Sequence, residues 1–528
     1  MTKLVDKMLL RIRVIATWCS LIPLMSLATA CASSTPQGDD ADLVISGGMV
    51  YPGAAAPYIG DVAIRGDRIV YVGKRAPMPA GKVIDARGLI VAPGFIDPHT
   101  HIDAALVSED PKSRLVLPFL MQGVTTAFIG VDGSGDPTLI NRGALRSRDA
   151  NTTHTDIGVN VASYVGLGPV RQRVVGLKRL APTPVELSTM TNLVQSAMCR
   201  GALGLSTGLF YAPQSFAQRD EVVALAKAAA TYGGVYDTHI RDESSYSIGL
   251  KAAIKEALEI GSGANIPVHI AHIKALGVDV HGQASEVVSI IETAREAGQV
   301  VHADQYPWTA SATGLSAALI PRWAQDGGRE AMLERFDDVA VMEKMRPEII
   351  DNLRRRGGPD SILITAGPDF VEGKTLEDIS NEAGEEAIDV AIAILRTSEA
   401  AIASFNQTEA DIATFMRQPW VVTGSDASRG HPRYFGSYAR KYAVYVRERK
   451  VLDLRTFIKR SSTATAKMFD LKDRGELKIG AFADVIAFDP DTFAARADYA
   501  NPERLATGMQ FVVINGKLAV EDGKATGL

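Results

Sequence analysis

The chain has 528 residues, of which 46% are hydrophobic and 22% are charged, and its formal net charge is −5. This composition is that of an ordinary folded protein and excludes a largely disordered chain. No stretch is rich in Lys or Arg, so the sequence predicts no nucleic-acid partner. The length fits about three domain equivalents, or one large barrel with an insertion and an accessory domain.

The N-terminus has the pattern of an export signal. A basic start is followed by the apolar run 14–30, and small residues then precede Cys31. This resembles a lipoprotein cleavage box and predicts a lipid anchor on Cys31. Leu27 lies one position further upstream than usual, which leaves ordinary signal cleavage or a permanent membrane anchor as alternatives. We expect a signal peptide at 1–30 and a tether at 31–42 in an exported bacterial protein, either periplasmic or membrane-anchored.

Short strands with turns are predicted at both ends of the mature chain, over residues 43–95 and 470–528. We expect these two segments to form one small β-sandwich-like domain. Between them, apolar strands alternate with helical patterns. Strands are predicted at 204–209, 234–239, 266–272 and 420–426, and helices at 221–231, 250–261 and 284–297.

The regular alternation of strands and helices indicates an α/β fold with a parallel sheet. Over about 300 residues the rhythm favours a (β/α)8 TIM barrel, which we place at 96–469. The polar and largely helical segment at about 310–418 breaks the rhythm. We expect it to be an insertion before the last barrel strand that covers the mouth of the barrel.

The motif His99-Thr100-His101 follows the apolar run 89–98, which has the character of a strand buried in a parallel barrel. Residues two apart on a strand face the same side, so both imidazoles are expected to converge. At the C-terminal end of a barrel strand they can hold a divalent metal. Spacing alone produces many false pairs, so further ligands are needed.

Later strands end in residues that can supply these ligands, namely His239, His272 and Asp426. His269 is an odd number of residues from His272, which predicts opposite faces and a core position for His269. A carboxylate at Asp426 can bind metal, accept a proton from metal-activated water and return it to a leaving amine. We therefore predict a metal site with Asp426 as its catalytic residue.

This ligand arrangement resembles the amidohydrolase superfamily, and within it the N-acyl-D-amino-acid deacylase (D-aminoacylase) branch. The resembling segments are 91–97, 204–213, 239–243, 272–274, 304–310, 424–426, 431–433 and 480–485. The resemblance implies a hydrolase that deacylates N-acyl-D-amino acids by metal-activated water. It also implies one or two divalent ions, with zinc the first candidate, and a small-molecule amide substrate that carries a free carboxylate.

Three positions bear on how far the resemblance extends. The strand at 204–208 offers no Lys for carbamylation, so a carbamate bridge is not expected. Asp132 stands where this branch usually has Cys, and it is predicted to bridge two metals, to complete a site for one metal, or to be a turn aspartate. Leu167 stands in place of a His and is expected to remove a polar group near the substrate.

The predicted tightest metal lies on His239 and His272 with Asp132. His99 and His101 are expected to hold a second, weaker metal or to shape the mouth around the first.

Cationic and hydroxyl partners for the substrate carboxylate are predicted at Lys274, Tyr211 and Arg433. The resemblance implies this role for Lys274 and Tyr211, whereas structural pairing is an alternative for Arg433.

Three functions remain open on the sequence. The first is an N-acyl-amino-acid deacylase. The second is another amide hydrolase of the same fold, such as a dipeptidase or a hydrolase of a xenobiotic amide. The third is a non-catalytic metal-binding lipoprotein, which the complete ligand set and Asp426 disfavour.

Overall fold

The computed structural model describes residues 40–139, 145–146, 153–154 and 156–527. The predicted signal peptide, Cys31 and most of the tether lie outside the described residues. Within the described ranges, no helix is both long enough and apolar enough to span a membrane.

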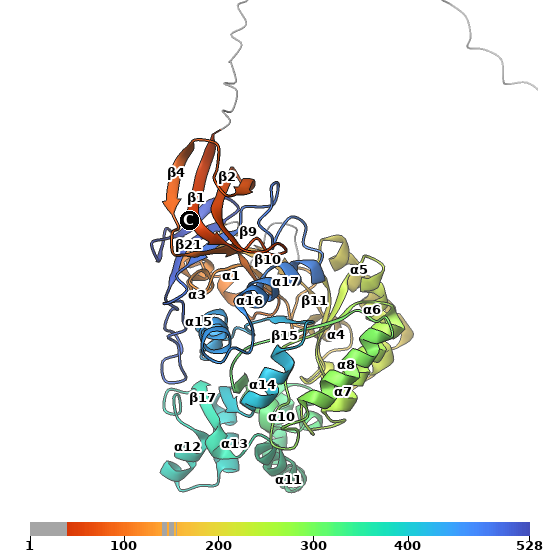
Figure 1. The fold of residues 1–528 in the computed structure, drawn as a ribbon. Helices are drawn as coiled ribbons and strands as arrows, with labels where there is room; N and C mark the ends of the chain where they lie inside the picture. The colour runs from red at the N-terminus through yellow and green to blue at the C-terminus, as the bar shows by residue number, and fades with distance from the viewer. Residues whose placement is uncertain (1–39, 140–144, 147–152, 155, 528) are drawn as a thin grey trace, which may run out of the picture.

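Parallel strands form the centre of the molecule (Figure 1). They are β6 (Phe95–Asp97), β7 (Val124–Ile129), β10 (Asn160–Ser163), β11 (Val165–Gly166), β12 (Gly204–Gly208), β13 (Val235–His239), β14 (Val268–Ile270), β15 (Val301–Gln305) and β19 (Val421–Thr423). One sheet has the order β10-β7-β6 and another the order β11-β12-β13-β14-β15-β19. A parallel bridge from Thr100 to Ala427 joins the ends of β6 and β19. With β10 and β11 taken as one interrupted strand, the described residues form an eight-stranded fold of the predicted TIM-barrel type.

Helices cover the outside of these strands. They are α4 (Leu167–Val174), α5 (Pro184–Cys199), α6 (Arg219–Ala230), α7 (Leu250–Ala264), α8 (Ala284–Glu296), α14 (Glu409–Met416), α16 (Leu454–Ser461) and α17 (Thr463–Met468). The strands are buried on both faces, because apolar helix faces pack against them. The predicted helices at 221–231, 250–261 and 284–297 match α6, α7 and α8 within a few residues.

The two ends of the described chain pair in one nine-stranded sheet. Its order is β23 (Lys524–Ala525), β22 (Lys517–Glu521), β21 (Met509–Ile514), β20 (Val485–Phe488), β5 (Ile90–Pro93), β1 (Ala41–Val50), β2 (Tyr58–Arg65) and β3 (Arg68–Gly73), and β4 (Ala80–Asp85) pairs with β1. The antiparallel pairing of β20 with β5 joins the C-terminal to the N-terminal segment.

The run 89–98 is not one barrel strand, as the sequence suggested. It divides at Gly94 into β5, which belongs to the nine-stranded sheet, and β6, which belongs to the barrel. A Cβ at Gly94 would lie 2.1 Å from Oγ1 of Thr125, so only glycine allows the chain to pass at this point.

The segment between β15 and β19 carries its own small core. Its elements are β16 (Ala310–Gly314), α9 (Leu315–Leu319), η2 (Arg322–Gln325), α10 (Arg329–Asp337), α11 (Val339–Arg355), η3 (Pro359–Ser361), β17 (Ile362–Ala366), α12 (Leu376–Ala383), α13 (Ala387–Thr397) and β18 (Ala401–Phe405). Its three strands form an antiparallel sheet in the order β16-β18-β17. The sequence predicted a largely helical segment and did not predict this sheet. The insertion ends before the predicted residue 418, since Phe415 of α14 already packs in the barrel core.

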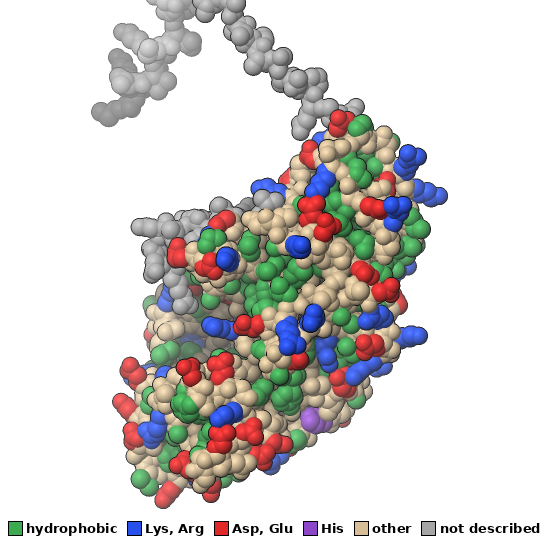
Figure 2. Space-filling view, turned by 90° about the vertical axis from the view of Figure 1, so that its left-hand side faces the viewer, with side chains coloured by type: hydrophobic (Ala, Val, Ile, Leu, Met, Phe, Trp, Pro, Cys, Tyr) green, Lys and Arg blue, Asp and Glu red, His purple; other side chains and the backbone are tan. Residues whose placement is uncertain are grey.

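The remaining elements connect these parts. They are α1 (Asp103–Leu106), α2 (Pro111–Arg114), α3 (Leu117–Leu120), β8 (Leu145–Arg146), β9 (Thr153–His154), η1 (Gln214–Phe216), α15 (Arg433–Arg440) and the π-helix η4 (Lys441–Glu448). On the face that Figure 2 shows, acidic and basic side chains are interspersed.

Candidate metal centre and active site

The six predicted metal-site residues come together beyond the C-terminal ends of five barrel strands. His99 and His101 follow β6, Asp132 follows β7, His239 ends β13, His272 follows β14 and Asp426 follows β19. All are buried except His101, whose side chain is 31% exposed. Parallel strands deliver their C-terminal ends to one side of a barrel, which is why residues so distant in sequence meet.

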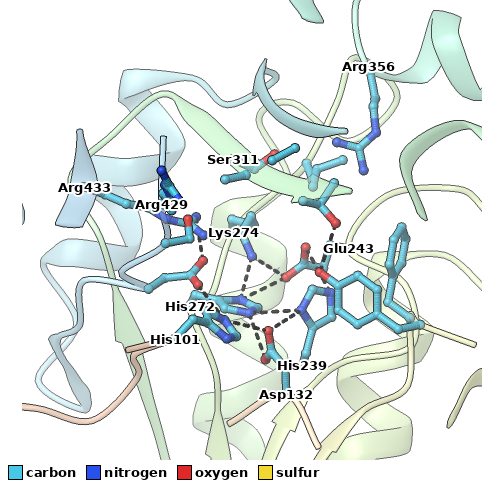
Figure 3. A pocket seen from close by; sticks show the side chains of 18 residues that line it. His101, Asp132, His239, Glu243, His272, Lys274, Ser311, Arg356, Arg429 and Arg433 are labelled. Carbon is cyan, nitrogen blue, oxygen red and sulfur yellow. Dashed lines mark hydrogen bonds and ion pairs between the residues drawn. The ribbon is translucent and has the colours of Figure 1, made fainter. Parts of the chain in front are cut away.

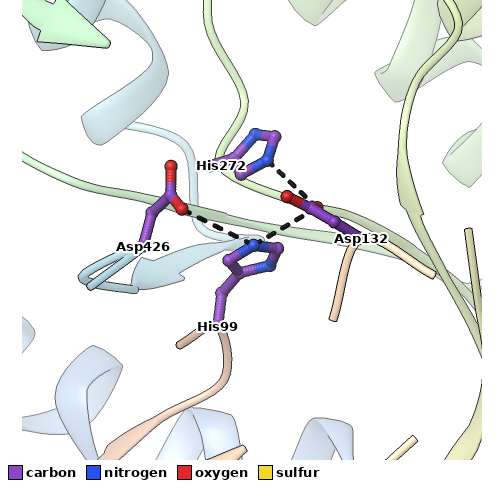
Figure 4. A group of neighbouring side chains, drawn as sticks. All are labelled: His99, Asp132, His272 and Asp426. Carbon is purple, nitrogen blue, oxygen red and sulfur yellow. Dashed lines mark ion pairs between the residues drawn. The ribbon is translucent and has the colours of Figure 1, made fainter. Parts of the chain in front are cut away.

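The carboxylate of Asp132 lies at the centre of the four histidines. Its Oδ1 is 3.3 Å from Nε2 of His99 and 3.3 Å from Nε2 of His272. Its Oδ2 is 3.3 Å from Nε2 of His101 and 3.7 Å from Nδ1 of His239. This position is inconsistent with a simple turn aspartate, because each of its oxygens faces two imidazoles. Figure 4 shows His99 and His272 converging on this carboxylate.

Three of these residues have a left-handed backbone. The φ angles are 52° at Asp132, 34° at His272 and 49° at Asp426. Non-glycine residues rarely adopt this conformation, and they concentrate at functional sites. The core position predicted for His269 is confirmed, because the residue is buried and its Nε2 lies 2.9 Å from Oδ2 of Asp304. The parity argument behind that prediction does not apply, because β14 ends at Ile270 and strand alternation does not extend to His272.

Backbone pairing holds the two outermost ligand segments together. The amide of Asp426 donates to the carbonyl of His99, and the amide of His101 donates to the carbonyl of Ala427, both at 2.9 Å. Below them, Oδ1 of Asp97 accepts from the amide of Ser425 at 3.0 Å and from the amide of His99 at 3.3 Å. The His-Thr-His motif is therefore held in position against Asp426.

Asp426 is an ionised carboxylate next to the histidines. Its Oδ1 lies 3.2 Å from Nε2 of His101 and its Oδ2 lies 2.7 Å from Nη1 of Arg433. Burial opposes ionisation, but the Arg433 guanidinium and the nearby imidazoles hold the pKa of Asp426 well below its usual range. Arg433, a predicted substrate-binding residue, is thus engaged with Asp426, and it is only 2% exposed.

Glu243 belongs to the same cluster, although sequence reasoning gave it no role. Its Oε2 lies 3.5 Å from Nε2 of His239 and its Oε1 lies 3.3 Å from Nδ1 of His272. These are the ring nitrogens on the side away from Asp132. Oε1 also accepts a hydrogen bond from Nζ of Lys274 at 2.5 Å. The signal in the sequence was an acidic residue four positions after a strand-end histidine, on the loop that follows β13.

The residues present fit a divalent metal ion. In the part of the chain that the structure describes, buried atoms without a hydrogen-bond partner include Nε2 of His99 and Oδ1 of Asp132. Two ligand groups are close enough to share an ion: His99, Asp132, His272 and Asp426 form one, and His239, Glu243 and His272 form the other. Imidazole nitrogens with carboxylate oxygens suit zinc and similar ions.

Electrostatics also favour a cation at this position. Burial lowers the pKa of His101, but contacts with Asp132 and Asp426 outweigh burial and raise it to about 10. Burial and Lys274 lower the pKa of His272, and the same two carboxylates raise it to about 10. The carboxylates therefore draw positive charge into the cluster, as a proton or as a metal ion.

A cavity of about 250 Å³ opens above this cluster (Figure 3). Its lining includes all three predicted substrate-binding residues, Lys274, Tyr211 and Arg433. The ring of Tyr211 lies 4.8 Å from that of His239, and its hydroxyl accepts from Oγ1 of Thr313 at 3.4 Å. The insertion supplies another part of the wall through Ser311, Ala312, Thr313, Arg356 and Ala401.

Leu167, which was expected to lie near the substrate, does not line this cavity. Its side chain is fully buried in the barrel core and is not among the lining residues. The expectation that Leu167 alters the substrate environment directly is wrong, because the residue begins α4 and faces the packed interior.

Residues 82–520 match the amidohydrolase family. The chain belongs to this family. It is 30% identical to the D-aminoacylase of Alcaligenes xylosoxydans xylosoxydans over 508 residues, covering 92% of this chain and 96% of that protein. It is 31% identical to the N-acyl-D-aspartate deacylase of the same organism over 510 residues, covering 92% and 93%.

A solved amidohydrolase structure shares the fold over nearly its whole length. It is the N-acyl-D-glutamate deacylase of Bordetella bronchiseptica, complexed with zinc and a phosphonate inhibitor that mimics the tetrahedral intermediate. The TM-score is 0.76 at 30% identity, over 92% of this chain and 99% of that one. The resemblance drawn from the sequence is confirmed.

Proposed function

We propose that the protein is a metal-dependent amide hydrolase that converts N-acyl-D-amino acids to a carboxylate and a free amino acid. The observation that carries this function is the carboxylate of Asp132 among four imidazoles, with ionised Asp426 beside them at the floor of a cavity. Similarity to deacylases over nine-tenths of the chain supports the same reaction.

His99, His101, Asp132, His239 and His272 would hold one or two ions, with zinc the first candidate. When bound, such an ion lowers the pKa of water and polarises a carbonyl group. Asp426 is the proton carrier in this proposal. Since Arg433 keeps its carboxylate ionised at neutral pH, Asp426 can accept a proton from water and then donate it to the departing nitrogen.

Glu243 acts as a positioning residue in this proposal. The nitrogens of His239 and His272 that face Asp132 can serve as ligands only when the proton of each ring sits on its other nitrogen. In both rings that other nitrogen faces Glu243, whose oxygens can accept the N–H. Nζ of Lys274 also lies 2.6 Å from Nδ1 of His272, and an ammonium group can only donate. Nδ1 of His272 can carry its proton and donate to Glu243 only when Lys274 bonds to Glu243 alone. In that state Glu243 would hold both rings in the metal-binding tautomer.

The α-carboxylate of the substrate is assigned to the wall that holds Lys274, Tyr211 and Arg433. Lys274 and the Tyr211 hydroxyl can donate to it, and burial raises the pKa of Tyr211, so the hydroxyl keeps its proton. Arg433 contributes positive charge from its place against Asp426.

We also propose the chain organisation and location that the sequence suggested. The signal peptide is 1–30 and the tether 31–42, with a lipid on Cys31 in the periplasm. The β domain at 43–95 and 470–528 flanks the barrel at 96–469. Metabolic labelling with palmitate tests the anchor, and Cys31→Ala is expected to abolish the label. A labelled Cys31→Ala protein would refute lipidation at this residue.

The proposed activity is tested by metal analysis and a substrate panel. Purified protein is loaded with zinc, and N-acetyl-D-amino acids are compared with their L-enantiomers and with dipeptides. Hydrolysis of the N-acetyl-D-amino acids at the highest kcat/KM is the expected result. Preferred dipeptide cleavage would refute the deacylase assignment, and metal-loaded protein that cleaves no amide would refute the enzymatic one.

A further inference from the structure

A second cavity, of about 340 Å³, lies between the insertion and the barrel. The insertion contributes η2 and α11 to its wall, and the barrel contributes the loops after β12 and β13. Among the described residues, none lines both this cavity and the one above the metal centre. The proposed hydrolysis therefore gives the second cavity no role.

Two hydrogen-bond donors in the wall of the second cavity lack an acceptor. Nη2 of Arg322 and Oγ of Ser215 are buried and have no hydrogen-bond partner in the described parts of the chain. The Arg322 guanidinium is held in place, because it lies 3.6 Å from the centroid of the Phe210 ring and its Nε donates to the Phe210 carbonyl at 2.9 Å. Buried donors without an acceptor are costly, so a ligand that accepts from both of them would stabilise this wall.

The wall also carries one positive charge in excess. Its charged residues are Arg179, Arg241, Arg322, Arg355, Glu348 and Asp351. Arg241 pairs with Glu256, and Arg355 pairs with Asp351. Within the described ranges, Arg179, Arg322 and Glu348 form no ion pair, and Glu348 accepts a hydrogen bond from Nε1 of Trp323 at 3.1 Å. Two free guanidinium groups and one free carboxylate suit a ligand with a single negative charge.

The rest of the wall is apolar. Leu209, Phe216, Pro321 and Trp323 line it. Cavities that bind small organic molecules combine such apolar walls with a few polar groups that fix the orientation of the ligand. A carboxylate matches the planar guanidinium, and an apolar body fills the space that an inorganic anion would leave empty. The chemistry of the wall therefore selects a carboxylic acid with an apolar body.

Phe210 links the second cavity to the active site. Arg322 packs on its ring, and the same ring lines the cavity above the metal centre. There it lies 5.2 Å from the ring of Tyr211 and 5.5 Å from the ring of His239. A ligand that moves Arg322 would thus move a side chain that faces the substrate.

We propose that the second cavity binds a free carboxylic acid with an apolar body, and that the bound acid raises the KM of the active site through Phe210. The carboxylate accepts hydrogen bonds from Nη2 of Arg322 and Oγ of Ser215, and the apolar body packs on Trp323. The acid that the proposed hydrolysis releases belongs to this class, so the role of the cavity in feedback inhibition rests on the proposed function.

The binding test compares phenylacetate with its neutral isostere phenylacetamide on zinc-loaded protein. Tryptophan fluorescence reports on the site, because Trp323 is partly exposed whereas Trp308 and Trp420 are buried. Phenylacetate is expected to change the emission and to bind about 10- to 100-fold more tightly than phenylacetamide. In Trp323→Phe the change in emission is expected to disappear, while calorimetry still detects binding.

Variants of the two donors assign the site. Arg322→Met is expected to raise the Kd of phenylacetate about 10- to 100-fold, and Ser215→Ala about 2- to 10-fold. Ser215→Ala carries the test if Arg322→Met does not fold. Arg346→Met is the matched control, since Arg346 also lies on α11 but pairs with Glu386 and Asp389 outside the cavity. Its Kd is expected to equal that of the wild type.

Two results of the titrations would overturn the proposal. One is equal binding of phenylacetate and phenylacetamide, or a Kd for phenylacetate that neither Arg322→Met nor Ser215→Ala changes. The other is binding that Lys274→Ala abolishes and Arg322→Met leaves intact, because the acid would then occupy the active site.

Kinetics test the link between the two cavities. Saturating phenylacetate is expected to raise the KM for an N-acetyl-D-amino acid about 5-fold in the wild type and to have no effect in Arg322→Met. An unchanged KM in the wild type would refute the feedback role, and so would an equal rise in Arg322→Met, which indicates competition in the active site. If no amide is cleaved, the proposed function fails, whereas the titrations still decide whether the second cavity binds the acid.

Discussion

Replacement of Glu243 is expected to weaken metal binding without unfolding the protein. Its two oxygens face the distal nitrogens of His239 and His272 at 3.5 and 3.3 Å. Loss of such an outer partner typically costs about 10- to 100-fold in metal affinity. Because two imidazoles depend on one carboxylate, Glu243→Ala is expected to raise the Kd for zinc by about 10²- to 10⁴-fold. Glu243→Gln keeps one acceptor oxygen and is expected to lose about 10- to 100-fold.

The assay is competition for zinc against a chromophoric chelator, with bound metal counted after dialysis. Circular dichroism and the Tm of the metal-free protein check the fold. Glu256→Gln is the matched control, since Glu256 pairs with Arg241 at 2.8 Å and contacts no histidine of the site. Its Kd for zinc is expected to equal that of the wild type.

A double variant distinguishes the positioning of the imidazole rings by Glu243 from a purely electrostatic effect of its charge. Removing Glu243 also leaves Lys274 unpaired beside His272, and this charge alone would repel a cation. The double variant Glu243→Ala/Lys274→Ala removes that charge. If lost ring orientation is the cause, the double variant still binds zinc weakly. A wild-type Kd in Glu243→Ala, or full recovery in the double variant, would refute the positioning role.

Three further outcomes follow from the site and the core. Asp426→Asn is expected to lower kcat by about 10²- to 10⁴-fold with little change in zinc content, and an active variant would exclude the proton-carrier role. Lys274→Ala is expected to raise KM about 10- to 100-fold with a much smaller effect on kcat, and an unchanged KM would count against substrate binding. Burial and the charge of Arg460 lower the pKa of Lys441 from 10.5 to about 7, and its Nζ has no hydrogen-bond partner among the described residues. The unfolded state therefore binds more protons between pH 7 and 10.5, so stability rises with pH across this window and the full penalty remains below pH 7. Lys441→Met is expected to raise the Tm at pH 7 by several degrees, with a gain that shrinks towards pH 10; calorimetry that finds equal gains at both pH values would contradict this.

The sequence by itself determined the barrel and the identity of its ligands. Apolar strands alternating with amphipathic helices specify a parallel sheet, and residues at the C-terminal ends of such strands converge by geometry alone. His99, His101, His239, His272 and Asp426 could therefore be named from local pattern. The helices α6, α7 and α8 were equally clear, because a 3.6-residue period needs no tertiary information.

Only the tertiary structure decided how these residues act together. Strand parity failed at His272 because the chain turns into a left-handed conformation there. The run 89–98 is divided between two sheets at Gly94, where the close approach of Thr125 leaves no room for a side chain. Asp132 became the centre of the cluster because its turn directs the carboxylate inwards, and local periodicity carries no information about such turns.

The charged wall of the cavity depended on contacts between distant segments. Glu243 reaches two histidines, Arg433 is committed to Asp426, and Arg356 arrives from the insertion more than a hundred residues beyond His239 along the chain. Such ion pairs form where packing brings opposite charges close together, and no short sequence motif encodes which residues will pair. The sequence thus named the metal ligands, whereas packing decided which charges remain free to bind a substrate.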